Sequence, residues 1–344
     1  MRLQDASLLA RTALTAYGLP ENSEVRFVKH RENHVFRADT PAGDSYAMKL
    51  HRPGYRTDAE VHTELTYLKA LAENGHPVPQ VLPAADGALC AVVSRGGHTR
   101  RVSVMSWLKD AEPFSDAAEA FTGTDQASQE DFAAVGALLA RLHRTAESLG
   151  TLSDFSRGAW DADGLAGPAP QWGDPRMLPS LSTAEQKLIT AALHKVHRNL
   201  SSLEADPRTF GMIHADTTPE NILRTPNGLM LIDFDDFGTG WYLFDLTTAL
   251  FHHTRQARYP ALRDALLNAY EQVRPLSDAE HEAWDALMLA RGLSYLGWAA
   301  ERPGDEASVF ICAHIAPWVL TLADAYTRGE SAPSGTAVPM KEIA

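Results

Sequence analysis

The sequence predicts an α+β fold with a small N-terminal antiparallel sheet plus helix and a larger, mainly helical C-terminal part. Two observations carry this prediction. Short strand-like runs separated by turn residues fill the first hundred residues and surround one long helical segment. From about residue 110 onward, segments with helical periodicity dominate, and a single clear hairpin interrupts them.

Composition limits the classes of function that the chain can serve. Its 344 residues allow one large domain or two lobes, and 44% apolar residues suffice for a substantial core. The net charge of -13 argues against nucleic-acid binding, which needs a basic face, and against docking on an anionic membrane. No run approaches the ~20 apolar residues of a membrane span, and the N-terminus lacks the apolar core of a signal peptide. Cys90 and Cys312 predict no disulfide framework, so we expect a cytoplasmic protein.

The N-terminal part is expected to hold five strands and one long helix, after a short amphipathic helix at 6–17. The long helix, at 57–74, begins at a capping box formed by Thr57 and Glu60. The strands are expected at 24–28, 34–39, 45–50, 88–94 and 99–107. Because the helix follows the third strand, this order predicts an antiparallel sheet packed on a single helix.

The C-terminal part is expected to be mainly helical. Its strongly periodic segments lie at 131–149, 185–203, 259–273 and 279–300. Residues 156–175 are rich in Gly, Pro and Trp and are expected to form a loop. We therefore divide the chain into an N-terminal part at 1–107, a C-terminal part at 108–330 and a loose tail at 331–344.

One hairpin in the C-terminal part gathers acidic residues. It lies in the run GMIHADTTPENILRTPNGLMLIDFDD, residues 211–236. Its expected strands, at 222–224 and 229–233, flank the strong turn signal at 226–228.

Three side chains of this run have the chemistry of a metal site. Asp216 and Asn221 precede the hairpin, and Asp233 ends its second strand. A loop that ends in a hairpin brings them toward one point. Carboxylate and amide oxygens are hard ligands for Mg²⁺, which usually also keeps waters and engages substrate phosphates. We therefore expect a magnesium site here, with Asp216 facing an acceptor hydroxyl.

The same residues resemble a known superfamily. HADTTPEN, 214–221, resembles the H-x-D-x-x-x-x-N catalytic loop of the protein-kinase-like superfamily. IDFDD, 232–236, resembles the short replacement for D-F-G in the aminoglycoside phosphotransferase and choline kinase-like branch. The resemblance runs from about 24 to 300 and is sharpest at 211–246. It implies a bilobal protein-kinase-like fold and an ATP- and Mg²⁺-dependent phosphotransferase with an alcohol group as acceptor.

The resemblance also implies roles for matching positions. Asp216 would orient the attacking hydroxyl and accept its proton, while Asn221 and Asp233 would hold Mg²⁺ against the ATP phosphates. His214 resembles the loop histidine that braces the backbone. Asp245, in GTGWYLFDL, resembles the helix acid that anchors the catalytic loop.

The N-terminal part supplies the other expected nucleotide contacts. SYAMKL at 45–50 offers Lys49 for the α- and β-phosphates, and Ala47 on the same strand face can pack on adenine. Glu64 lies on the inward apolar stripe of the following helix, so we choose it as the partner of Lys49. Glu60 is better explained by the capping box, and a solvated Glu64 is the structural alternative.

Two weaker assignments follow from position along the chain. HRENHVF, 30–36, lies where a kinase glycine-rich loop would cover the phosphates, contains no glycine, and offers Asn33 or main-chain N–H groups instead. The run from Met105 to Leu108, with Ser106 and Trp107, lies where main-chain groups would bind adenine. Core packing is the alternative for Trp107.

The acceptor is expected to be a small molecule. Conventional Ser/Thr kinases resemble H-R-D-L-K-P-E-N, but Thr218 replaces the lysine here, and the segment between D-F-G and A-P-E is absent. Asp235, Asp236 and Arg291 are expected near the acceptor, and the extra acids would suit an aminoglycoside, amino alcohol or homoserine-like amino acid. The sequence is equally compatible with an alternative in which Asp235 and Asp236 support the loop or a second Mg²⁺. A stress-response-type Ser/Thr protein kinase and a nucleotide-binding pseudoenzyme scaffold are the alternatives.

Overall fold

The computed structural model describes residues 1–330, and the predicted loose tail at 331–344 lies outside them. The described chain divides into two compact units. Unit 1 comprises Met1–Glu112, Leu152–Arg157 and Arg224–Ile232. Unit 2 comprises the described remainder, namely 113–151, 158–223 and 233–330. The chain therefore returns to unit 1 twice after the N-terminal segment ends. The division expected from the sequence, between residues 107 and 108, does not include these two returns.

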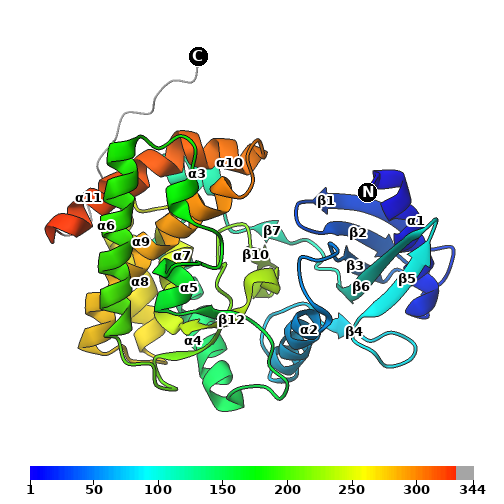
Figure 1. Cartoon of the computed structure of the whole chain (residues 1–344). Helices are drawn as coiled ribbons and strands as arrows, with labels where there is room; N and C mark the ends of the chain where they lie inside the picture. The colour runs from blue at the N-terminus through cyan, green and yellow to red at the C-terminus, as the bar shows by residue number, and fades with distance from the viewer. Residues whose placement is uncertain (331–344) are drawn as a thin grey trace. The chain divides into compact units, whose positions relative to one another are not determined.

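Unit 1 is built on an antiparallel sheet, drawn in blue to cyan in Figure 1. The strand order is β1-β2-β3-β6-β4, and β5 pairs with β6. Their bounds are β1 Glu24–His30, β2 His34–Asp39, β3 Ser45–Leu50, β4 Val81–Leu82, β5 Ala91–Arg95 and β6 His98–Ser106. The five predicted strands are present, and the two-residue β4 is an addition too short to predict from alternation.

Two helices belong to unit 1, α1 (Leu3–Ala16) and α2 (Asp58–Glu73). The buried face of α1 shares one hydrophobic cluster with the strands, in which Leu9 and Leu14 join Phe36 and Val104. The expectation that the sheet packs on a single helix is therefore wrong, because α1 covers it as well. The predicted capping box of α2 is present, with Thr57 and Glu60 each bonding the other's backbone N–H.

Unit 2 is mainly helical, as predicted. The four predicted long helices are α4 Gln129–Leu149, α6 Thr183–Ser201, α8 Tyr259–Glu271 and α9 Asp278–Ala300. The remaining helices are α3 Ala117–Thr122, α5 Ala162–Ala166, η1 Pro175–Met177, η2 Phe234–Asp236, α7 Tyr242–Phe251, α10 Glu306–Phe310, η3 Ile311–Ile315 and α11 Ala316–Arg328. In Figure 1, α9 lies beside α6 and α11, and these helices pack on one another.

Three short strands form a sheet next to the loop that carries Asp216 in unit 2. Their bounds are β8 Ala159–Trp160, β9 Phe210–Ile213 and β12 Gly238–Trp241, with β12 between the other two. Strand β12 pairs antiparallel with β9 and parallel with β8. The predicted hairpin is formed by β10 (Ile222–Thr225) and β11 (Gly228–Leu231), and its residues 224–231 belong to unit 1; β7 covers Glu112–Pro113. Strand β8 and helix α5 occupy the stretch 156–175, which the sequence had indicated to be a loop.

One helical stretch, Glu306–Arg328, has the length and the mean hydropathy, 1.5, of a membrane span. No such run is expected from the sequence. Of its most apolar window, 44% is buried inside the protein, and Ile311, Trp318 and Val319 are buried residues of this stretch. A single helix of this kind is weak evidence for a membrane span, because core helices pass the same test. The cytoplasmic location stays a prediction.

Candidate active site

The loop that carries Asp216 is held by one buried carboxylate on α7. Asp245 accepts hydrogen bonds from the backbone N–H of His214, at 2.9 Å, and of Ala215, at 2.7 Å. The hydroxyl of Thr217 donates to the Asp245 carbonyl oxygen at 2.6 Å. Ala215 has a left-handed backbone, with φ 64, which non-glycine residues rarely adopt. The loop therefore needs this carboxylate to stabilise its turn, as expected for the helix acid.

A buried histidine that no sequence motif marks continues this anchor. His143 on α4 lies with Nε2 3.0 Å from Asp245 Oδ2 and with Nδ1 2.9 Å from the Tyr270 hydroxyl. Burial lowers the pKa of His143, although its hydrogen bond to Asp245 opposes that shift. The helical period of α4 predicts only that position 143 faces inward, and the partner lies about a hundred residues away in sequence.

Both oxygens of the Asp216 carboxylate receive a donor. The Asn221 amide donates through Nδ2 to Oδ2 at 2.8 Å, and Arg291 donates through Nη2 to Oδ1 at 2.6 Å. Asn221 Nδ2 also donates to the Asp216 carbonyl oxygen at 2.9 Å. The Asp216 side chain keeps 22% of its surface exposed, so it is still partly accessible from outside the protein.

His214 is fully buried and braces the loop. Its Nδ1 accepts a hydrogen bond from the backbone N–H of Asp216 at 3.2 Å. Its ring centroid lies 4.3 Å from that of Phe234. These contacts match the structural role that the resemblance implies, and no exposed edge of the ring is left to react.

The acids after the hairpin have different surroundings. Asp233 precedes the short helix η2 and has a left-handed backbone, with φ 64. Asp236 accepts at Oδ1 from the Trp172 indole N–H at 3.0 Å, and its carbonyl oxygen accepts from the Trp160 indole N–H at 2.8 Å. These contacts support the loop around Asp236, while an acceptor contact or a role toward a second Mg²⁺ stays a prediction for Asp235 and Asp236. Asp235, in η2, is half-buried.

Contrary to the expectation from the sequence, Arg291 does not line an open wall of an acceptor site. Its side chain has no exposed surface and is paired with Asp216. Residue 291 lies mid-way along α9, where sequence periodicity cannot tell a buried arginine from one that faces a substrate.

The expected metal site, Asn221 and Asp233, offers side-chain oxygen atoms as ligands. No group of three or more His, Cys, Asp or Glu within residues 1–330 is arranged to hold a metal. The expected ligand pair, Asn221 and Asp233, is one amide and one carboxylate, so it is not a group of that kind. Because Asn221 uses Nδ2 for Asp216, its Oδ1 is the end that suits a cation. The donor set fits Mg²⁺, which takes one or two protein ligands plus phosphates and waters.

Unit 1 contains the expected ion pair. Lys49 Nζ lies 3.1 Å from Glu64 Oε1, and the side chains are 7% and 1% exposed. Arg157, whose side chain has no exposed surface, adds a second cation with Nη1 3.9 Å from Glu64 Oε2 and 3.5 Å from the Glu60 carbonyl oxygen. Arg157 could not be singled out from the sequence, because it lies in the Gly- and Trp-rich stretch, far from α2 along the chain.

The other expected nucleotide residues also lie in unit 1. Asn33 is buried and accepts at Oδ1 from the backbone N–H of Arg52 at 2.9 Å. Ala47 pairs in register with Met105, on β3 and β6. Backbone N–H groups of Ser106 and Trp107 already donate, to Gln80 and Ser45 respectively, whereas Leu108 is half-buried. These positions remain predictions for adenine and phosphate contacts.

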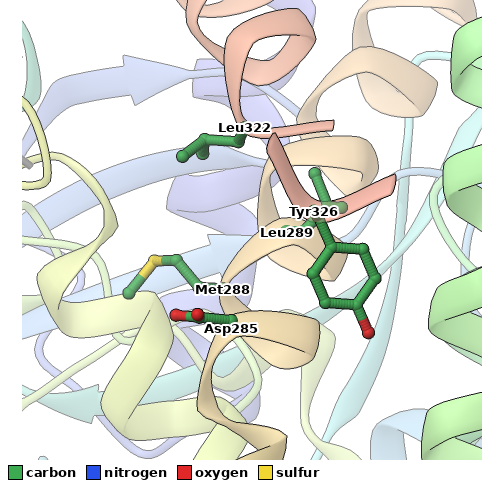
Figure 2. A pocket seen from close by; sticks show the side chains of 5 residues that line it. All are labelled: Asp285, Met288, Leu289, Leu322 and Tyr326. Carbon is green, nitrogen blue, oxygen red and sulfur yellow. The ribbon is translucent and has the colours of Figure 1, made fainter. Parts of the chain in front are cut away.

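A small hollow of unit 2 shares none of these residues. Figure 2 shows its lining by Asp285, Met288 and Leu289 of α9 and by Leu322 and Tyr326 of α11. Its lining offers one carboxylate and mainly apolar surface, which does not provide the donors for a triphosphate. The candidate site is therefore assigned from side-chain chemistry and not from this hollow.

Comparison with known proteins fits this geometry. The model of the phosphotransferase enzyme family matches residues 24–287. The chain is 29% identical over 311 residues to an uncharacterized protein of Deinococcus radiodurans, covering 87% of this chain and 84% of that relative. It is 27% identical over 284 residues to a homoserine kinase of Burkholderia ambifaria, covering 78% and 76%.

Two solved structures are similar over almost the whole chain. A microcompartment-associated aminopropanol kinase has a TM-score of 0.81 at 26% identity and covers 95% of this chain and 99% of its own. An amicoumacin kinase in complex with AMP-PNP and Ca²⁺ has a TM-score of 0.71 at 18% identity, covers 92% and 93%, and shares the fold. The protein therefore has the protein-kinase-like fold, belongs to the phosphotransferase enzyme family, and is a kinase that transfers phosphate to an alcohol group.

Proposed function

We propose that the protein transfers the γ-phosphate of ATP, with Mg²⁺, to the hydroxyl of a small acceptor that also bears an amine. The observation that carries this proposal is the carboxylate of Asp216, fixed by two donors and still partly exposed. A carboxylate held in this way can accept a hydrogen bond from an alcohol and align it for transfer.

Each remaining site residue has a role in positioning or in charge neutralisation. Asn221 and Asp233 would hold the metal ion, which would neutralise the charge of the phosphates. Lys49 would bind the α- and β-phosphates, and Glu64 orients its ammonium group through the 3.1 Å ion pair. Ala47, Asn33 and the backbone near Trp107 would contribute the remaining nucleotide contacts. The chain itself does little covalent chemistry, because phosphoryl transfer depends mainly on alignment and electrostatics.

Three observations favour a small, amine-bearing acceptor. Only residues 234–241 separate Asp233 from helix α7, which leaves little platform for a peptide. The net charge of -13 gives a cationic acceptor a favourable field. The similar proteins with named substrates include kinases of aminopropanol and homoserine. A short amino alcohol is therefore the first choice, a homoserine-like amino acid the second, and an aminoglycoside the third.

An acceptor panel tests the proposal directly. ADP release would be measured with Mg²⁺ and ATP, with and without amino alcohols, homoserine, aminoglycosides, matched alcohols without the amine, and unfolded protein rich in Ser and Thr. Stimulation by amine-bearing alcohols, with a phosphate ester seen by ³¹P NMR, is the expected result. Stimulation by protein alone would favour the protein-kinase alternative. ATP binding without any turnover would favour the scaffold alternative.

A further inference from the structure

The surroundings of Arg291 are unusual for a surface-type side chain. It has no exposed surface, and its guanidinium contacts the loop that carries Asp216 at two points. Nη2 lies 2.6 Å from Asp216 Oδ1, and Nη1 lies 3.2 Å from the Ala215 carbonyl oxygen. Nη2 also lies 3.0 Å from the hydroxyl of Tyr295, one helical turn further along α9. Arg291 therefore bridges α9 and the catalytic loop.

Two aromatic rings fix the plane of this guanidinium. The Arg291 Cζ atom lies 4.3 Å from the ring centroid of Trp172 and 4.3 Å from that of Tyr295. Rings at this distance attract a cation through their negative faces. The Trp172 indole N–H donates to Asp236, which follows the expected metal ligand Asp233. One ring therefore ties Arg291 to the loop of the metal ligand as well.

The backbone next to Trp172 leaves this ring little freedom. Gly297 of α9 packs so closely on Gly173 that an added Cβ would collide with the carbonyl oxygen of Gly173. Gly173 itself has a left-handed backbone, with φ 98. Because Trp172 is held from two sides, its ring can act as a fixed support for the guanidinium.

A buried cation with one carboxylate partner is strongly constrained. Arg291 is buried, so the loss of its carboxylate partner would leave its charge uncompensated, and Arg291 and Asp216 hold each other's orientation. The planar guanidinium donates at fixed angles, which a flexible ammonium group does not do. Arg291 on Oδ1 and Asn221 on Oδ2 together fix the plane of the carboxylate.

We propose that Arg291 is a positioning residue for the phosphotransfer, which uses the rings of Trp172 and Tyr295 to hold the Asp216 carboxylate in line with the acceptor hydroxyl. This inference rests on the proposed function. Arg291 does not touch the substrate and acts only through Asp216. An interaction of this kind changes the rate of transfer more than the binding of the nucleotide.

The first test replaces Arg291 with Met, which keeps much of the length but removes charge and donors. We expect kcat to fall ~100-fold, which is what misplacement by about 1 Å can cost, while KM for Mg·ATP changes less than about threefold. Arg291→Lys is expected to recover part of kcat, because it restores the charge but not the fork of donors. The matched control is Arg302→Met, since Arg302 also stacks on a ring, Trp298 at 4.5 Å, but away from Asp216.

A second variant covers the case in which Arg291→Met does not fold. Tyr295→Phe keeps the ring and removes only the hydroxyl next to Nη2. We expect kcat to fall ~3- to 10-fold, on the scale of one lost hydrogen bond. Tyr259→Phe is the control, because that buried hydroxyl bonds the Trp284 indole instead.

A double variant separates positioning from general destabilisation. If Arg291 acts through Asp216, adding Tyr295→Phe or Arg291→Met to Asp216→Asn should lower the residual kcat less than twofold. A full additional loss in the double variant would overturn the inference, and so would an active Arg291→Met or Tyr295→Phe enzyme with unchanged kcat. Wild-type protein without turnover on any acceptor would instead overturn the proposed function.

Discussion

Asp245 Oδ1 lies 2.7 Å from the backbone nitrogen of Ala215, and this hydrogen bond stabilises the turn that presents the proposed base. The turn is strained, since Ala215 has φ 64, a backbone conformation that costs roughly 1–2 kcal/mol for a residue with a Cβ. A buried carboxylate that accepts from two backbone N–H groups offsets this cost. The precision of the site therefore depends on a residue that touches no substrate.

We expect Asp245→Asn to lower the free energy of unfolding by about 1–3 kcal/mol. The amide has only one oxygen that can accept a hydrogen bond, so one buried backbone N–H group is left unpaired. Urea-induced unfolding of the full chain measures this loss. Asp264→Asn serves as the control, because that side chain is 63% exposed and should change stability by less than ~0.5 kcal/mol. Equal stability of Asp245→Asn and wild type would argue against the anchor.

In unit 1, we expect Glu64→Gln to weaken the binding of Mg·ATP about tenfold or more, because Lys49 and Arg157 lose the carboxylate between them. Isothermal titration with Mg·ATP gives the affinity. Glu73→Gln, the same change near the end of the same helix, removes only the exposed pair with Lys69 and should leave the affinity unchanged. Unaltered affinity in Glu64→Gln would contradict the role given to Lys49.

Asp233→Asn should weaken the binding of Mg·ATP but have little effect on the binding of metal-free ATP, since the proposed role of Asp233 is to ligate the ion. The comparison of titrations with and without Mg²⁺, in wild type and variant, isolates this effect. Asp285→Asn is a suitable control, because that carboxylate lines the separate hollow on α9. An identical Mg²⁺ dependence in Asp233→Asn and wild type would remove Asp233 from the metal site.

His252 gives the stability of the fold a dependence on pH. Burial, together with the nearby Arg291 and His253, lowers the pKa of His252 from 6.5 to about 3. The unfolded chain therefore binds this proton more readily, so the contribution is complete above pH 6.5 and is lost as the pH falls toward 3. We expect the free energy of unfolding to decrease at low pH by up to ~1.4 kcal/mol per pH unit from this residue.

The comparison of wild type with His252→Gln in urea at pH 7 and at pH 4.5 measures that contribution. The variant should lose less stability on acidification than wild type does. His194→Gln, at an exposed position, should behave as wild type. The same pH dependence in wild type and His252→Gln would contradict the lowered pKa.

Much of the fold was accessible from local signals. Capping, turn chemistry and helical period are local properties, so the Thr57 cap, the hairpin at 222–233 and the long helices of unit 2 follow from residues close in sequence. The covering of the sheet by α1 was missed, because amphipathicity tells that a helix has a buried face but not what it packs against.

The site was predictable only where a motif fixes its spacing. Asp216, Asn221 and Asp245 all lie within 211–246, where the family resemblance is sharpest. The hydrogen bonds from Asn221 to Asp216 and from the Ala215 backbone to Asp245 join residues of that one region. His143, Arg157 and Trp172 reach their partners over long sequence separations, and no period or motif marks such contacts. Arg291 was singled out as a late-helix residue, but its direction toward Asp216 depends on tertiary packing.

The most direct test of the central claim is acceptor-stimulated turnover in wild type and Asp216→Asn at matched Mg·ATP occupancy. Proton transfer and alignment by such a group contribute about 10²- to 10⁴-fold, so we predict a loss of that size with Mg·ATP affinity within about threefold of wild type. Near-normal turnover in Asp216→Asn, measured with an amino alcohol that wild type phosphorylates, would contradict the account.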